Sequence, residues 1–110
     1  MFDYRSYGRS DVSPGPLRRD ALLIDTLAAI DYAKSRPDVD PTRIGMYGYS
    51  LGGAFALGAM AQRPEIKATA TAAAFSSWAG IANSHVPILG WLLLPRGIDA
   101  TENVKPLDAR

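Results

Sequence analysis

The sequence contains no cysteine, which excludes disulfide bonds, thiolate metal sites and a cysteine nucleophile. It also lacks an excess of charge, because its twelve basic and eleven acidic side chains give a formal net charge of +1 and are scattered along the chain. Nucleic acids and anionic membranes are bound by clustered basic residues, so we expect neither as a partner. We expect no metal and no other cofactor.

Long apolar runs are missing as well. The longest, residues 86–95, reaches only about half the length that spans a bilayer, and it is interrupted by prolines. Residues 1–5 carry an acid and a base where a signal peptide has its apolar core. We therefore predict a cytoplasmic protein without a membrane span. The 47% hydrophobic and 21% charged residues are typical of a chain that folds around a core.

The spacing of apolar residues and the positions of glycine and proline predict the secondary structure of the first half of the chain. Residues 1–5 are interpreted as the tail of a strand, followed by a loop rich in Gly, Pro, Ser and Asp. A helix is predicted from about Pro16 to Arg36. Its apolar face is formed by Leu23, Leu27 and Ile30, and Pro37 ends it.

The second half adds two strands and a helix. Residues 43–48 form a short apolar run, interpreted as a strand buried on both faces, and a helix follows over Leu51–Gln62. Residues 67–75 are ambiguous, since alanine favours a helix whereas the threonines and the position after a crossover helix favour a strand. We interpret them as a strand. The alternation predicts an α/β fold with three parallel strands.

A Gly48-x-Ser50-x-Gly52 motif lies at the junction between the second strand and the second helix. A serine hydroxyl attacks a carbonyl only when a base takes its proton and nearby donors hold the oxyanion. A sharp strand-to-helix turn exposes such a serine and leaves little room beside it, which Gly48, Gly52 and Gly53 would provide. The backbone N–H of Leu51 is then the expected oxyanion donor. The structural alternative is a glycine-rich turn that only packs a strand against a helix.

These residues resemble the α/β-hydrolase superfamily, nearest to its serine-aminopeptidase-like and dienelactone-hydrolase-like members and to the α/β-hydrolase-domain lipases. The resemblance extends over roughly Phe2–Phe75 and is carried by four further segments: residues 2–10, 29–32, 40–44 and 64–68. It implies one incomplete α/β-hydrolase domain over residues 1–110, with a core in residues 1–75 and a cap or connecting segment in residues 76–110. It transfers only Ser50 as nucleophile and Leu51 as oxyanion donor, since the family's acid and histidine follow the serine on later strands.

His85 is the only histidine of the sequence. Its default interpretation is a surface or capping position. Catalysis by His85 is the less favoured alternative, because the family's order of serine, acid and histidine leaves only Glu65 as the acid between Ser50 and His85. The later acids are interpreted as solvated: Asp99, Glu102 and Asp108. Residues 91–94 are either a core-facing cap helix or an apolar wall for a substrate.

Four more residues near the predicted site have two interpretations. Arg5 and Arg9 could meet a substrate charge, but an ion pair with Asp3 or Asp11 is the favoured interpretation. Tyr7 and Tyr49 flank the predicted site and are candidates to line it.

Two functions follow from the resemblance. The first is a serine hydrolase acting on a carboxylic ester, thioester or amide of a small molecule or peptide through an acyl-serine, here as a fragment without the usual Asp and His. The second is an inactive remnant in which the elbow has a structural or interaction role. An incomplete sheet leaves an uncovered edge, which invites self-association or a complementing chain.

Overall fold

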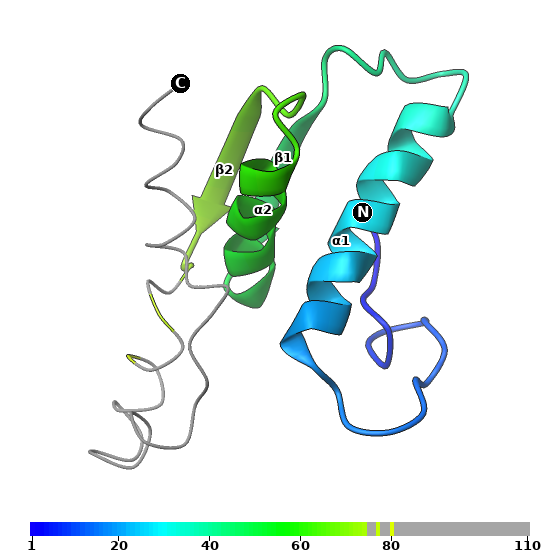
Figure 1. Cartoon of the computed structure of the whole chain (residues 1–110), viewed down its shortest axis with the longest axis vertical. Helices are drawn as coiled ribbons and strands as arrows, with labels where there is room; N and C mark the ends of the chain where they lie inside the picture. The colour runs from blue at the N-terminus through cyan, green and yellow to red at the C-terminus, as the bar shows by residue number, and fades with distance from the viewer. Residues whose placement is uncertain (75–76, 78–79, 81–110) are drawn as a thin grey trace.

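The computed structural model describes residues 1–74, 77 and 80 of the 110-residue chain. The elements follow in the order α1 (Arg19–Ser35), β1 (Gly45–Tyr49), α2 (Leu51–Gln62) and β2 (Ala68–Ala72). Strands β1 and β2 are parallel neighbours, and α2 connects them across one face of the sheet (Figure 1). The chain therefore has helices and parallel strands, as predicted for a partial α/β fold.

Helix α1 is shorter at its start than predicted. The chain bends through Gly15, which has φ 84°, and the helix begins at Arg19 instead of Pro16. Asp20 lies in the first turn, where the helix dipole favours negative charge. The helix ends at Ser35 because Arg36 precedes a proline and takes the extended conformation that such a residue prefers.

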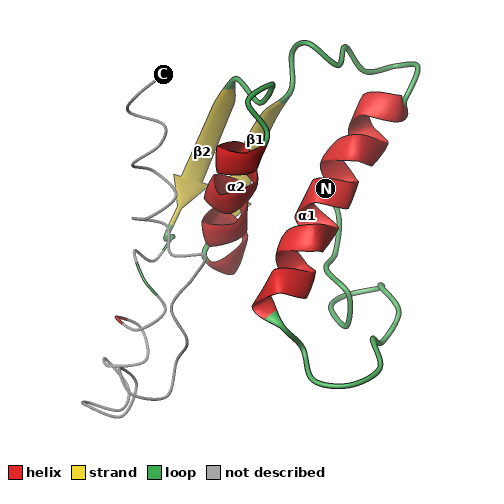
Figure 2. Cartoon of the chain, viewed as in Figure 1, coloured by secondary structure: helices red, strands yellow, loops and turns green. Residues whose placement is uncertain are grey.

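Helix α2 lies beside α1 and packs on both strands (Figure 2), and the core is formed where these elements meet. Ile30 of α1 and Ala59 of α2 are buried together with Ile66, which follows α2. Partly buried apolar side chains surround them: Leu23, Leu27, Ile44, Met46 and Met60. The predicted apolar face of α1 is thus confirmed, and Leu22 and Thr26 extend its buried surface toward the N-terminal loop.

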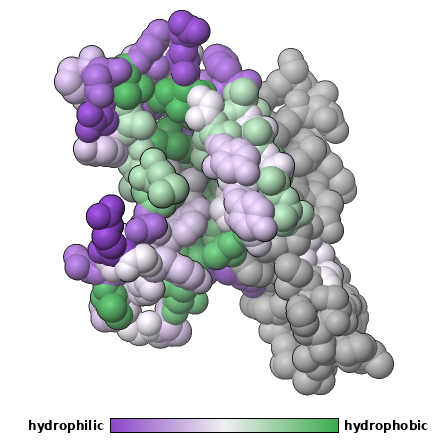
Figure 3. Space-filling model, turned by 180° about the vertical axis from the view of Figure 1, so that it is seen from behind, coloured by the Kyte–Doolittle hydropathy of each residue, from purple (hydrophilic) through white to green (hydrophobic). Residues whose placement is uncertain are grey.

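The prediction that the strand before the elbow is buried on both faces was wrong. Tyr47 and Tyr49 of β1 are 72% and 68% exposed. Parallel strands are buried on both sides only where helices cover both faces, and in the described part of the chain α2 covers one. Figure 3 views the molecule from behind, where apolar and weakly polar residues reach the surface.

The prediction of a strand at Met1–Arg5 was also wrong. The backbone of this segment forms hydrogen bonds with a side chain and within a turn, instead of with a neighbouring strand. The Arg5 backbone N–H donates to the Asp25 carboxylate at 3.0 Å, and the Tyr4 carbonyl accepts from the Tyr7 N–H at 2.9 Å. The described part of the chain therefore contains two parallel strands, not three.

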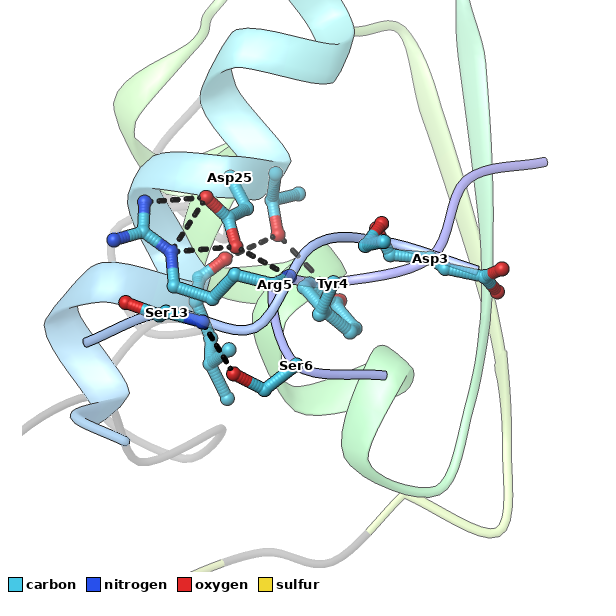
Figure 4. Close-up of polar contacts among 9 residues, drawn as sticks. Asp3, Tyr4, Arg5, Ser6, Ser13 and Asp25 are labelled. Carbon is cyan, nitrogen blue, oxygen red and sulfur yellow. Dashed lines mark hydrogen bonds and ion pairs between the residues drawn. The ribbon is translucent and has the colours of Figure 1, made fainter. Parts of the chain in front are cut away.

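An ion pair holds the N-terminal loop (residues 1–16) against α1. The Arg5 guanidinium contacts both carboxylate oxygens of Asp25, with the shortest distance, 2.6 Å, between Nη2 and Oδ1 (Figure 4). The Tyr4 ring packs 5.6 Å from the ring of Phe55 in α2, measured between centroids. Within the loop, the Ser13 N–H donates to the Ser6 hydroxyl at 3.0 Å. The loop is thus fixed to both helices.

This ion pair makes a testable contribution to stability against acid. Its hydrogen bonds hold the pKa of the Asp25 carboxyl below the ordinary 3.8. Because the pKa is lower in the folded state, the stabilisation is fully present above pH 3.8 and is lost as the pH falls through the folded-state value. We expect Asp25→Asn to destabilise the chain at neutral pH and to differ less from wild type as the pH falls below 3.8, measured by urea unfolding at each pH. An unchanged difference down to the lowest pH would contradict the ion-pair explanation.

Candidate active site

Ser50 lies between the end of β1 and the start of α2, as predicted, with φ 49° and ψ −115°. A positive φ is unfavourable for a residue with a Cβ atom and is kept only where the surroundings enforce it. Ser50 is the N-cap of α2, yet its side chain makes no capping hydrogen bond, although serine is favoured at N-caps for that bond. Helix capping therefore does not explain why a serine occupies this half-buried position.

The backbone of Ser50 is held on both sides. Its N–H donates to the Ala72 carbonyl of β2 at 2.8 Å, and its carbonyl accepts from the N–H groups of Gly53 at 3.0 Å and Ala54 at 3.4 Å. The Ser50 N–H is thus already bonded. The N–H of Leu51 belongs to the first turn of α2, where N–H groups have no acceptor within the helix, so it is the better placed oxyanion donor of the two.

The start of α2 offers a favourable field for an anion. The helix has 12 residues and no acidic residue in its first turn, so no carboxylate offsets the positive end of the helix dipole. Negative charge that develops beside Ser50 would be stabilised there.

Two of the three predicted elbow glycines are required by close contacts. A Cβ atom at Gly48 would lie 2.5 Å from the carbonyl carbon of Gly52 and 2.6 Å from the nitrogen of Gly53. A Cβ atom at Gly53 would lie 2.7 Å from the Ala74 Cβ. In contrast, a Cβ atom at Gly52 meets nothing within 4 Å in the described part of the chain. The crowding that was expected at Gly52 is thus not found there.

The other predicted site residues are not brought together with Ser50 by any described contact. Tyr49 is adjacent in sequence and 68% exposed, whereas Tyr7 is 44% exposed and packs near Tyr4 in the N-terminal loop. The favoured partners of Arg5 were wrong, because it pairs with Asp25. The backbone N–H of Arg9, not its guanidinium, donates to the Asp3 carboxylate at 3.1 Å.

Several predicted residues lie outside the described residues, namely His85, the run 91–94, Asp99, Glu102 and Asp108. In the described part of the chain no group of His, Asp and Glu side chains could hold a metal ion. No helix there combines the length and the apolar character that a membrane span requires.

Sequence reasoning missed two features of the site region. Asp25 is a partly buried carboxylate next to the buried Thr26 on α1, and its pairing with Arg5 was not anticipated. The second is the segment Ala72–Ala74, whose Ala73 has φ 53°. Alanine gives no sequence signal for that conformation, which glycine and asparagine usually adopt.

Comparison with known proteins finds a family and several relatives. Residues 14–91 match the Dienelactone hydrolase family. YfhR of Salmonella typhi is 39% identical over 104 residues, covering 84% of this chain and 35% of the relative. The Alpha/beta hydrolase domain-containing protein WAV2 of Arabidopsis thaliana is 31% identical over 109 residues, covering 98% of this chain and 33% of the relative. The chain thus spans about a third of the length of these relatives. No solved structure matches it.

Proposed function

This chain belongs to the Dienelactone hydrolase family, within the α/β-hydrolase superfamily, and we propose that it carries the nucleophile of a serine hydrolase. The observation that carries the proposal is the backbone of Ser50, which is held at φ 49° between β1 and α2 while its side chain caps nothing. Such a strained turn is the geometry that exposes a nucleophilic hydroxyl in this superfamily.

The reaction we propose is acyl transfer from a carboxylic ester, thioester or amide. The Ser50 oxygen forms a bond to the carbonyl carbon as a base takes the hydroxyl proton, and the carbonyl electron pair moves to the oxygen. The Leu51 N–H and the start of α2 stabilise that oxyanion. Collapse expels the alcohol, thiol or amine, which receives the proton. Water then releases the acid from Ser50 by the same steps.

The base is the component for which the described residues offer no candidate of the usual kind. They contain no histidine, since His85 lies outside them. The base would be His85, or a residue of the kind that the longer relatives carry outside the matched region. A complementing chain or a second copy of this chain could also supply the base. The alternative function is an inactive domain with a structural elbow, and it would hold if no such base reaches Ser50.

Labelling by a fluorophosphonate probe tests the proposal. We expect the purified chain to be labelled and Ser50→Ala to abolish the label, because the probe reacts with an activated serine. Ser35→Ala, which removes a hydroxyl bonded to the Tyr32 carbonyl on α1, is the matched control and should leave labelling unchanged. If the folded chain remains unlabelled, both alone and with the remaining part of a full-length relative added as a second chain, the inactive alternative holds.

A further inference from the structure

Two strained residues lie on either side of one hydrogen bond. Three residues other than glycine have positive φ in the described part of the chain: Ser6, Ser50 and Ala73. Ser50 is the donor of the bond to the Ala72 carbonyl, and Ala73, with φ 53°, directly follows the acceptor. Two unfavourable backbone conformations are thus coupled through a single 2.8 Å contact.

The acceptor is itself fixed by the sheet. Tyr49 is paired with Ala72 in the last register position of β1 and β2, so the bond from Ser50 continues the parallel ladder by one step into the elbow. In Figure 1 the tip of β2 lies at the same end of the molecule as the start of α2. The ladder therefore reaches the nucleophile itself.

After the left-handed turn at Ala73, Ala74 lies against the first turn of α2. The Ala74 Cβ lies 2.7 Å from the place where a Cβ atom of Gly53 would be, so methyl and glycine fit against each other. A strand that only ended at Ala72 would not need a left-handed alanine, because an extended or right-handed residue would end it without strain. The contact with Gly53 and the bond from Ser50 together give a reason for the strain.

We propose that Ala72–Ala74 is a positioning element for Ser50, in which the left-handed turn at Ala73 keeps the Ala72 carbonyl on the Ser50 N–H. Ala73 is a positioning residue and takes no part in the chemistry. The element keeps Ser50 at positive φ and leaves the adjacent Leu51 N–H as the donor for an oxyanion. This inference rests on the proposed function, in that the positioned group is the nucleophile.

Ala73→Val and Ala73→Gly form the matched test in the full 110-residue chain. A β-branched residue opposes positive φ, whereas glycine accepts it. We expect Ala73→Val to speed hydrogen exchange of the Ser50 amide at least tenfold and to slow fluorophosphonate labelling at least tenfold, with unchanged exchange at Ala59 in the middle of α2. Ala73→Gly should keep both Ser50 values within about twofold of wild type.

The outcomes separate the inference from the proposed function. An unchanged exchange rate of the Ser50 amide in a folded Ala73→Val chain overturns the inference. Faster exchange at both Ser50 and Ala59 overturns it as well, because it would indicate a merely structural role of Ala73. If wild type is labelled neither alone nor with the second chain added, the proposed function fails, while the exchange at Ser50 still decides on the positioning element.

A rescue experiment covers the case in which Ala73→Val does not fold. Gly53→Ala introduces a methyl group against Ala74, and Ala74→Gly removes the opposing methyl. The new methyl would also lie 3.2 Å from the Gly48 carbonyl oxygen and 3.3 Å from the Thr71 Cβ, two milder contacts that Ala74→Gly does not relieve. We expect Gly53→Ala alone to speed Ser50 amide exchange at least tenfold and the double change to recover part of the lost protection. A double variant no better than Gly53→Ala alone would overturn the inference.

Discussion

We expect Gly48→Ala to destabilise the chain more than any other single methyl addition at the elbow. The new Cβ would lie 2.5 Å from the Gly52 carbonyl carbon and 2.6 Å from the Gly53 nitrogen. These are backbone atoms in the first turn of α2, so the contact is relieved only by moving the helix away from β1. Overpacking of this kind costs typically about 1–3 kcal/mol, and we expect the upper end or more because no side chain can rotate away. Urea unfolding measures the loss.

Gly52→Ala is the control for this prediction, since it adds the same methyl group four residues later. A Cβ atom there meets nothing within 4 Å in the part of the chain that the structure describes. Alanine is favoured over glycine in a helix by about 1 kcal/mol, so we expect neutral or slightly increased stability. Equal losses in the two variants would mean that the elbow is not as close-packed as the structure has it.

The elbow and its flanking elements were predictable because their signals are local. The Gly48-x-Ser50-x-Gly52 spacing, the apolar run before it and the alanine-rich helix after it each fall within a few residues. Helix α2 was predicted with its observed bounds, Leu51–Gln62, and β2 lies within the ambiguous segment 67–75. For these elements, local preference and the final packing favour the same structure.

The errors concern features that depend on distant partners. Residues 1–5 have a sequence that suits a strand, but Arg5 finds Asp25 on α1, twenty residues away, and this ion pair holds the segment as a loop. In the same way, the apolar run of β1 does not tell how many of its faces are covered. The exposure of Tyr47 and Tyr49 depends on what packs against the sheet.

The conformation of Ala73 could not be predicted for a different reason. Its positive φ results from the meeting of the β2 end with Ser50 and Gly53, and its own side chain has no preference for it. The predicted nucleophile is thus read from a motif, whereas the residues inferred to position it become visible only when the strands are paired.

A second large loss is expected from Phe55→Ala. Phe55 of α2 is fully buried, and its ring packs against the Tyr4 ring. Tyr4 in turn contacts the Phe2 ring, with 5.0 Å between the ring centroids. The Tyr4 hydroxyl lies 3.5 Å from the Thr26 hydroxyl oxygen. Removing a buried phenylalanine ring costs about 3–5 kcal/mol, as lost burial plus a cavity. Because this ring joins the N-terminal loop to α2, we also expect Phe55→Ala to increase the amide exchange rate, relative to wild type, more in residues 4–10 than in α1.

Ile24→Ala is the matched control, because it also shortens a large apolar side chain, but one that is 57% exposed on α1. We expect a loss within about 0.5 kcal/mol, as for most surface substitutions. Phe55→Leu should lie between the two, since leucine fills part of the volume. If Phe55→Ala lowered stability no more than Ile24→Ala, the Tyr4–Phe55 contact would not hold the N-terminal loop, and the Arg5–Asp25 ion pair would be its main attachment.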